Sequence, residues 1–272
     1  MDPVTQGKTD FALSDRDAVE WLSALPAASV DLLVTDPPYE SLEKHRAVGT
    51  TTRLKKSKAS SNAWFEVFPN ARFPELFEAA YRVLKPDSHF YLFCDQETMF
   101  VAKPLAEAAG FRFWKPLVWD KLKIGMGYHY RARYEFILFF EKGKRKLRNL
   151  GVPDVIREPR VMRGYPTEKP SAVSTVLIEQ SSDPGDLVVD PFCGSGSVGV
   201  AALRAGRRFF GNDTSEEART YARERLIQEG GVERPLELSG PLGRRAKGDA
   251  GGGDLWDARG PEDDGRQLVL GV

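Results

Sequence analysis

The sequence predicts an α/β protein with a doubly wound, mostly parallel sheet. Short apolar runs alternate along the chain with segments of helical period. Two of these runs, Val30–Val34 and Leu187–Val189, lead into an Asp-Pro pair, at Asp36 and Asp190. Ligands of open α/β sheets collect at the carboxyl ends of strands, so both pairs are expected at one edge of the sheet.

Each element of the first half is predicted from its pattern. Phe11–Leu13 and Val30–Thr35 are apolar strands, and His89–Cys94 is a strand of aromatic and apolar residues. Helices are expected at Asp17–Leu25, at Pro74–Leu84, which Lys85-Pro86-Asp87 stops, and at Glu97–Ala109, which Gly110 ends. Residues 40–70 are polar and basic and predict a long loop.

The second half continues the alternation. Strands are predicted at Pro116–Trp119, Phe136–Phe140, Leu187–Val189 and Arg208–Gly211, and helices at Ser171–Gln180, at Val198–Leu203 and from near Ser215. Residues 121–134 form a connection rich in Gly, Tyr and Arg, and residues 142–163 are basic with little hydrophobic period. We expect one domain over residues 1–230 and a disordered tail over 231–272, which is rich in Gly, Pro, Asp and Arg.

Asp36-Pro37-Pro38-Tyr39 is the most informative stretch. A carboxylate can accept hydrogen bonds from an amino group, and prolines hold nearby carbonyls rigid and free to accept. The tyrosine ring can stack on a planar heterocycle. The tetrapeptide therefore suits an exocyclic amine on a nucleobase that has left its helix, although a Pro-Pro turn that merely ends a strand has the same pattern.

A glycine loop follows the strand that ends at Asp190. Gly194, Gly196 and Gly199 have the G-x-G-x-x-G spacing of a nucleotide-binding loop between a strand and a helix. Asp213 lies 19 residues beyond Gly194, where an acid would bind ribose hydroxyls. The loop indicates an adenosine-containing cofactor, which leaves NAD and S-adenosylmethionine open.

Together the two motifs resemble those of the amino-methylating DNA methyltransferases. With the catalytic motif first and the cofactor loop second, the chain is similar to the β class of that family. Tyr165 to Pro170 resembles the family's Pro-Thr-x-Lys-Pro segment, and Arg16 to Leu22 resembles its Gly-Asp-Ala-Leu-Glu segment, with Arg16 in place of the glycine. The resemblance covers roughly residues 10–228.

The resemblance implies a circularly permuted, Rossmann-like sheet of seven strands with one antiparallel strand, for which Phe136–Phe140 is the best match. It implies S-adenosylmethionine as cofactor and double-stranded DNA as partner. The catalytic residues would be Asp36, Pro37, Pro38 and Tyr39. The cofactor-binding residues would be Asp17, Thr167, Lys169, Asp190, Phe192, Cys193, Gly194, Ser195, Gly196 and Asp213.

The target base follows from the first motif position. In this family Asp at that position is usual for adenine N6, and Ser is commoner for cytosine N4, so Asp36 favours adenine and cytosine N4 is the alternative. A catalytically silent DNA-binding module and an NAD-dependent oxidoreductase are more remote alternatives. The oxidoreductase reading leaves the Asp-Pro-Pro-Tyr motif unused.

Composition excludes several other classes. No apolar run is long enough to span a membrane and no leader pattern is present, so we expect a cytoplasmic protein. His45, His89 and His129 have no metal-ligand spacing, and we predict no metal site. Cys94 and Cys193 give no disulfide framework, and Cys193 fits a packing role better than that of a nucleophile.

The charge distribution indicates where DNA would bind. The net charge is zero, but residues 40–58 carry +4 (six Lys/Arg against two acids) and residues 121–163 carry +8 (twelve against four). Lys55, Lys56, Lys58, Arg131 and Arg133 are the predicted DNA-binding residues. No separate recognition domain is evident, so the enzyme reads a short site or needs a second copy of itself or a partner.

Overall fold

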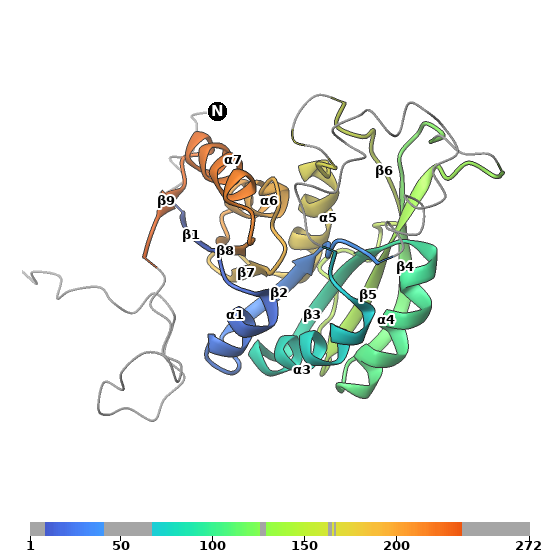
Figure 1. Cartoon of the computed structure of the whole chain (residues 1–272), viewed down its shortest axis with the longest axis horizontal. Helices are drawn as coiled ribbons and strands as arrows, with labels where there is room; N and C mark the ends of the chain where they lie inside the picture. Colours follow the sequence, from blue (N-terminus) through green and yellow to red (C-terminus); the bar gives the residue numbers. More distant parts are fainter. Residues whose placement is uncertain (1–8, 41–66, 126–128, 163–164, 166, 236–272) are drawn as a thin grey trace, which may run out of the picture.

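A computed structural model describes residues 9–40, 67–125, 129–162, 165 and 167–235 of the 272-residue chain. These residues form one nine-stranded sheet in the order β6-β4-β5-β3-β2-β7-β8-β1-β9 (Figure 1). Strand β5 is antiparallel to both of its neighbours, and every other adjacent pair is parallel.

The strands are short at both edges and long in the middle. Their bounds are β1 Asp10–Ser14, β2 Val30–Thr35, β3 Leu84–Cys94, β4 Arg112–Asp120, β5 Tyr134–Lys142, β6 Val155–Arg157, β7 Leu187–Asp190, β8 Arg208–Asn212 and β9 Val232–Glu233. The helices are α1 Ala18–Ala24, α3 Phe73–Val83, α4 Gln96–Ala108, α5 Ser171–Ser181, α6 Ser197–Arg204 and α7 Glu216–Gln228, with a 3₁₀ turn, η4, at Asn70–Arg72.

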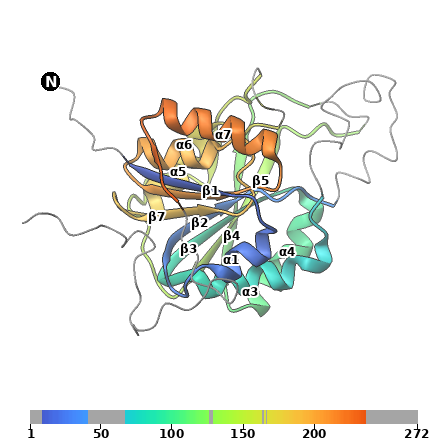
Figure 2. The same ribbon diagram turned by 60° about the vertical axis from the view of Figure 1, so that its left-hand side comes forward.

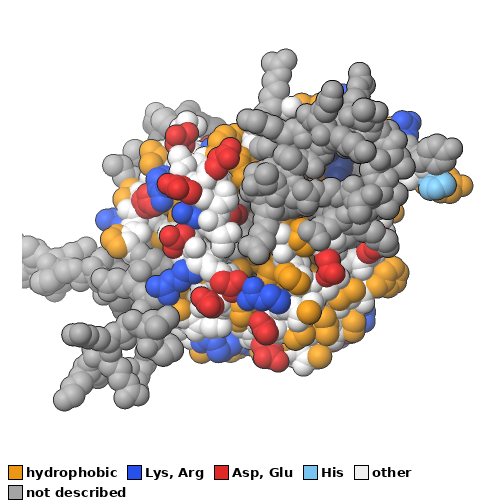
Figure 3. Space-filling model, in the orientation of Figure 1, with side chains coloured by type: hydrophobic (Ala, Val, Ile, Leu, Met, Phe, Trp, Pro, Cys, Tyr) orange, Lys and Arg blue, Asp and Glu red, His pale blue; other side chains and the backbone are white. Residues whose placement is uncertain are grey.

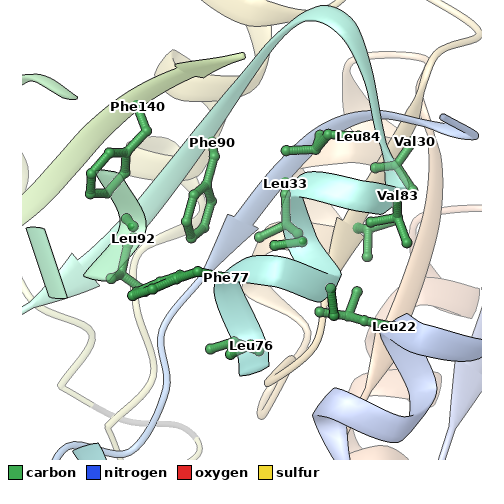
Figure 4. Packing of buried hydrophobic residues seen from close by; sticks show 14 of the residues in the cluster. Leu22, Val30, Leu33, Leu76, Phe77, Val83, Leu84, Phe90, Leu92 and Phe140 are labelled. Carbon is green, nitrogen blue, oxygen red and sulfur yellow. The ribbon is translucent and has the colours of Figure 1, made fainter. Parts of the chain in front are cut away.

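Helices cover both faces of the sheet, as a doubly wound fold requires. Helices α1, α3 and α4 lie on one face and α5, α6 and α7 on the other (Figure 2). Each face has its own apolar cluster. On the first face, Leu22 of α1 and Phe77 of α3 pack near Leu33 of β2 and Phe90 of β3 (Figure 4). Helices packed on both faces of the sheet hold the carboxyl ends of its strands at fixed positions.

Side-chain caps fix where several helices begin. Asp17 accepts hydrogen bonds from two backbone N–H groups of α1, Asp95 accepts one from Thr98 in α4, and Ser215 accepts one from Ala218 in α7. Gly196, whose φ of 76° suits glycine, is the N-cap of α6. All four of these helices follow a parallel strand, so their N-termini lie at the carboxyl edge of the parallel strands.

The predicted elements are all present, and the fold class is confirmed. Phe136–Phe140 lies within the antiparallel strand β5. Two short strands were not predicted: β6, within the basic segment 142–163, and β9, within the predicted tail. For Val232 and Glu233 the prediction of disorder is therefore wrong, because they pair with β1. Residues 236–272 lie outside the described residues.

Candidate functional site

The two Asp-Pro pairs meet at the carboxyl edge of the sheet. Strands β2 and β7 are parallel neighbours, which places Asp36, just past the end of β2, beside Asp190, the last residue of β7. The Thr35 hydroxyl donates a 2.7 Å hydrogen bond to Oδ1 of Asp190. The two Asp-Pro pairs, about 150 residues apart in sequence, thus lie at one edge of the sheet as predicted, on directly neighbouring strands.

The Asp36 carboxylate has a partner on each oxygen. The Tyr39 hydroxyl donates to Oδ1, and the Lys169 ammonium donates to Oδ2. Both oxygens are thus engaged, which holds Asp36 in one orientation. An incoming amine has to share an oxygen with one of these two donors or displace it.

The motif around Asp36 is rigid. Tyr39 is only 7% exposed and belongs to the first apolar cluster. Burial, with help from the Asp36 charge, raises its pKa well above the ordinary value, so its hydroxyl stays protonated and donates. The Pro38 carbonyl accepts from Phe68 N at 2.8 Å, whereas no described donor contacts the Pro37 carbonyl. For Tyr39 to stack on a base, the ring would have to leave its present position.

Lys169 lies between two carboxylates. Besides Asp36, Glu135 Oε2 lies 3.4 Å from its ammonium nitrogen. Burial alone would lower the Lys169 pKa, but the charges of Asp36 and Glu135 outweigh it and raise that pKa. Lys121 forms a further ion pair with Glu135. Lys169, predicted to bind the cofactor, is thus held at the catalytic motif in this structure.

The glycine loop presents open backbone at the same edge. Gly194 has a φ of 47°, and a Cβ built there would meet nothing within 4 Å. Its N–H donates a 2.9 Å hydrogen bond to Asp213. Burial raises the pKa of Asp213, which also accepts a hydrogen bond from Ser215 N. Ser215 itself caps α7. Loop and acid together form a cradle of the kind that an adenosine cofactor needs.

Three residues in and beside the glycine loop are buried. Asp190 is 2% exposed, and burial raises its pKa to about 7. Burial also raises the pKa of the Cys193 thiol well above its usual value, which makes it a poor nucleophile. Ser195 is buried, and its hydroxyl lies 3.0 Å from that of Ser197.

Two other predicted cofactor residues have different surroundings. Asp17 caps α1 and forms a two-pronged ion pair with Arg72, at 2.7 and 2.8 Å, which lowers its pKa. Thr167 is exposed and has a φ of 60°, an unusual backbone conformation for a β-branched residue. Neither side chain forms a hydrogen bond with a described residue of the glycine loop.

The predicted DNA-binding residues divide into two groups. Lys55, Lys56 and Lys58 lie outside the described residues. Arg131 is exposed in the connection between β4 and β5 and has no ion pair with a described residue, whereas Arg133 is paired with Asp120 at 2.6 Å. On the face in Figure 3, Lys and Arg side chains of the described residues are interspersed with Asp and Glu. Four of the twelve basic residues of the +8 segment pair with acids outside it, namely Arg133, Arg145, Arg148 and Arg157.

Three site residues were missed by sequence reasoning. Phe68 connects the motifs, since it forms a bridge with Tyr39 and packs edge-on against the half-buried Phe192 at 5.1 Å. Arg225 of α7 donates to the Ser195 carbonyl at 2.7 Å. Glu135 had a readable signal: it is an acid at the start of the one antiparallel strand, and that start lies at the carboxyl edge of the parallel strands.

A hollow of about 350 Å³ lies between the end of β1 and α7. Arg219, one of its lining residues, donates a 2.7 Å hydrogen bond to the Asp213 carbonyl. The hollow is therefore close to the acid predicted to bind ribose.

Among the described residues, no cluster of three or more His, Cys, Asp and Glu side chains is arranged to hold a metal ion. No helix in the same part of the chain combines the length and apolar character needed to cross a membrane.

Comparisons with known proteins agree with this geometry. A family model described as DNA methylase (N6_N4_Mtase) matches residues 30–224. The DNA adenine methyltransferase YhdJ of Escherichia coli K12 is 28% identical over 257 residues, which cover 79% of this chain and 82% of that protein.

Two solved structures are similar in fold. M1.HpyAVI in complex with SAM has a TM-score of 0.60 at 22% identity and covers 79% of this chain and 100% of its own. The cytosine-N4-specific PvuII DNA methyltransferase has a TM-score of 0.61 at 16% identity and covers 84% of this chain and 98% of its own. At these identities the likeness extends to the fold alone.

Proposed function

Because this chain belongs to the N6/N4 DNA methylase family, we propose that it transfers a methyl group from S-adenosylmethionine to the exocyclic N6 amino group of adenine in double-stranded DNA. The observation that carries the proposal is the meeting of Asp36 and the glycine loop at one edge of the sheet. Two contacts join the motifs: the hydrogen bond from Thr35 to Asp190 and the packing of Phe68 against Phe192.

The methyl donor is S-adenosylmethionine, which carries its methyl group on a sulfonium and needs only an aligned nucleophile. The cradle fits it, because the Gly194 backbone faces open space and Asp213 lies beside it. The backbone from Phe192 to Gly196 would surround the methionine part. Asp190 would pair with the ammonium, and Asp213 would accept from the ribose hydroxyls.

Asp36 would orient the acceptor amine. An exocyclic aromatic amine is a poor nucleophile because its lone pair is delocalised into the ring. Hydrogen bonds from the amine to Asp36 and to the Pro37 carbonyl would favour a more tetrahedral nitrogen and direct its lone pair at the methyl group. The amine can reach Asp36 only when its base has left the helix. Catalysis is then positioning and electrostatics, without a covalent enzyme intermediate.

Adenine is favoured over cytosine by the first motif position. The resemblance described above associates Asp there with adenine N6 and Ser with cytosine N4. YhdJ, a relative at 28% identity, carries the printed description of an adenine methyltransferase. Cytosine N4 remains the second candidate, because the PvuII cytosine-N4 enzyme has the same fold.

Nucleoside analysis of methylated DNA tests the proposal. Unmethylated DNA of mixed sequence is incubated with the protein and S-adenosylmethionine, digested, and analysed by mass spectrometry. We expect N6-methyladenine, and its loss with the Asp36→Ala variant. N4-methylcytosine as the sole product would contradict the adenine assignment and leave the family intact.

A further inference from the structure

We propose that Glu135 is a positioning residue: it provides the second acceptor to which Lys169 turns when the target amine takes Asp36. The inference rests on the proposed role of Asp36 as the group that orients the amine. It concerns a residue outside both sequence motifs.

The topology of the sheet brings Glu135 to the site. Strand β5 is antiparallel to its neighbours, so its second residue, Glu135, lies at the carboxyl edge of the parallel strands. It is paired in register with Trp119, near the end of β4. Four charges of alternating sign then follow one another in space: Asp36, Lys169, Glu135 and Lys121.

The two oxygens of Glu135 differ. Oε1 accepts a hydrogen bond from Lys121. Oε2 is buried and receives no hydrogen bond from a described residue, although the Lys169 nitrogen lies 3.4 Å away. Oε2 is thus ion-paired with Lys169 but not hydrogen-bonded, which is costly for a buried carboxylate oxygen. Because the ammonium has three donors, a small rotation of Lys169 would complete a hydrogen bond to Oε2.

This second acceptor solves a problem of the reaction. In this structure the Lys169 ammonium donates to Oδ2 of Asp36, where it competes with the incoming amine. Lys169 is 15% exposed, so it cannot leave Asp36 for water without a charge partner. Glu135 is that charge partner, and a short rotation of the Lys169 side chain brings the ammonium to it. Asp36 can then take the amine while the buried positive charge stays paired.

The test compares Glu135→Gln with a matched control from the same strand. Glu141→Gln also removes a buried β5 carboxylate, bonded to Trp114 and to Arg145 N, at the opposite end of the strand. Single-turnover transfer of tritiated methyl groups to DNA is measured at saturating S-adenosylmethionine and DNA. We expect at least a tenfold lower rate for Glu135→Gln, an unchanged cofactor Kd, and a rate close to wild type for Glu141→Gln.

A double-mutant cycle shows whether Glu135 acts through Lys169. In a Lys169→Gln background no ammonium needs a second acceptor, so adding Glu135→Gln should change the rate less than threefold. A full, additive loss in the double variant would overturn the proposal, and so would a wild-type rate for Glu135→Gln.

The readout separates this inference from the proposed function. Tritium transfer counts methylation of either base, so an error in the base assignment does not affect it. Asp36→Asn is assayed in parallel. If Asp36→Asn is inactive while Glu135→Gln keeps the wild-type rate, the role of Glu135 alone is wrong. If Asp36→Asn is fully active, the role of Asp36 is wrong, and that of Glu135 falls with it.

Discussion

At the residue scale, burial raises the pKa of two acids of the site, Asp190 and Asp213, because both are withdrawn from water. For Asp190 the raised pKa is about 7. An acid that is partly protonated before a cation arrives must lose its proton when the cation binds. Cofactor binding should therefore depend on pH.

The first prediction concerns this dependence at Asp190. With a pKa of about 7 in the free protein, Asp190 is mostly ionised at pH 7.5 and mostly protonated at pH 6. The affinity for S-adenosylmethionine should fall about tenfold between these values, because only the ionised form pairs with the ammonium. Isothermal titration calorimetry at several pH values measures it. Asp190→Asn should bind S-adenosylmethionine weakly at every pH. If its affinity falls with pH as steeply as that of the wild type, another group is responsible for the titration.

The second prediction concerns stability and His89. His89 is 1% exposed and lies between Ser181 Oγ, 2.7 Å from Nδ1, and the Arg145 carbonyl, 3.0 Å from Nε2. Burial lowers its pKa from 6.5 to about 4. The unfolded chain thus binds this proton below pH 6.5, but the folded protein binds it only below about pH 4.

Stability should therefore fall as pH drops from 6.5 to 4, by up to about 3 kcal/mol from this group. Urea unfolding at a series of pH values measures the loss. His89→Gln should lose less over that range, although it is less stable at pH 7. Equal losses in both proteins would rule out His89 as the cause.

At the scale of elements, the loop and helix after β7 use their glycines for different purposes. Gly194 faces open space, whereas a Cβ on Gly199 would lie 2.6 Å from the Phe209 ring and 2.8 Å from Leu226. The first glycine therefore serves the ligand, and the other lets α6 pack against the sheet. Spacing alone could not separate these roles, because both positions belong to one G-x-G-x-x-G pattern.

Two substitutions should separate the roles. Gly194→Val should weaken S-adenosylmethionine binding more than tenfold, with about 1–2 kcal/mol of destabilisation from its positive φ. Gly199→Ala should destabilise the fold by about 1–3 kcal/mol through overpacking and change the cofactor Kd little in the folded fraction. Thermal melts and calorimetry on both variants give the comparison. The reverse pattern would mean that Gly194 is structural.

At the scale of the whole molecule, sequence predicted the fold and the two motifs because both leave local patterns. Apolar runs predicted the seven longer strands, and the Asp-Pro pair after two of these runs marked the functional edge. The edge strands β6 and β9 were missed because two or three half-exposed residues have no readable period. The Asp36–Lys169 and Glu135–Lys169 pairs were missed because they join β2, β5 and the segment before α5, and such contacts depend on topology rather than on spacing.

A prediction at this scale concerns the DNA face. Arg131 is exposed and has no ion pair with a described residue, whereas Asp120 holds Arg133. Arg131→Ala should reduce the slope of log K against log salt for DNA binding by about one unit, the effect of one lost phosphate contact. Arg133→Ala should reduce it less. Fluorescence anisotropy over a salt series measures both slopes, and an unchanged slope for Arg131→Ala would place the DNA elsewhere.

The central claim is that Asp36 orients the acceptor amine and does not bind the cofactor. Its most direct test is single-turnover methyl transfer by Asp36→Ala at saturating DNA, with the Kd for S-adenosylmethionine measured on the same preparation. The account predicts that transfer is abolished while the Kd stays within about threefold of wild type, because only transition-state positioning is lost. A turnover rate near that of wild type would contradict it.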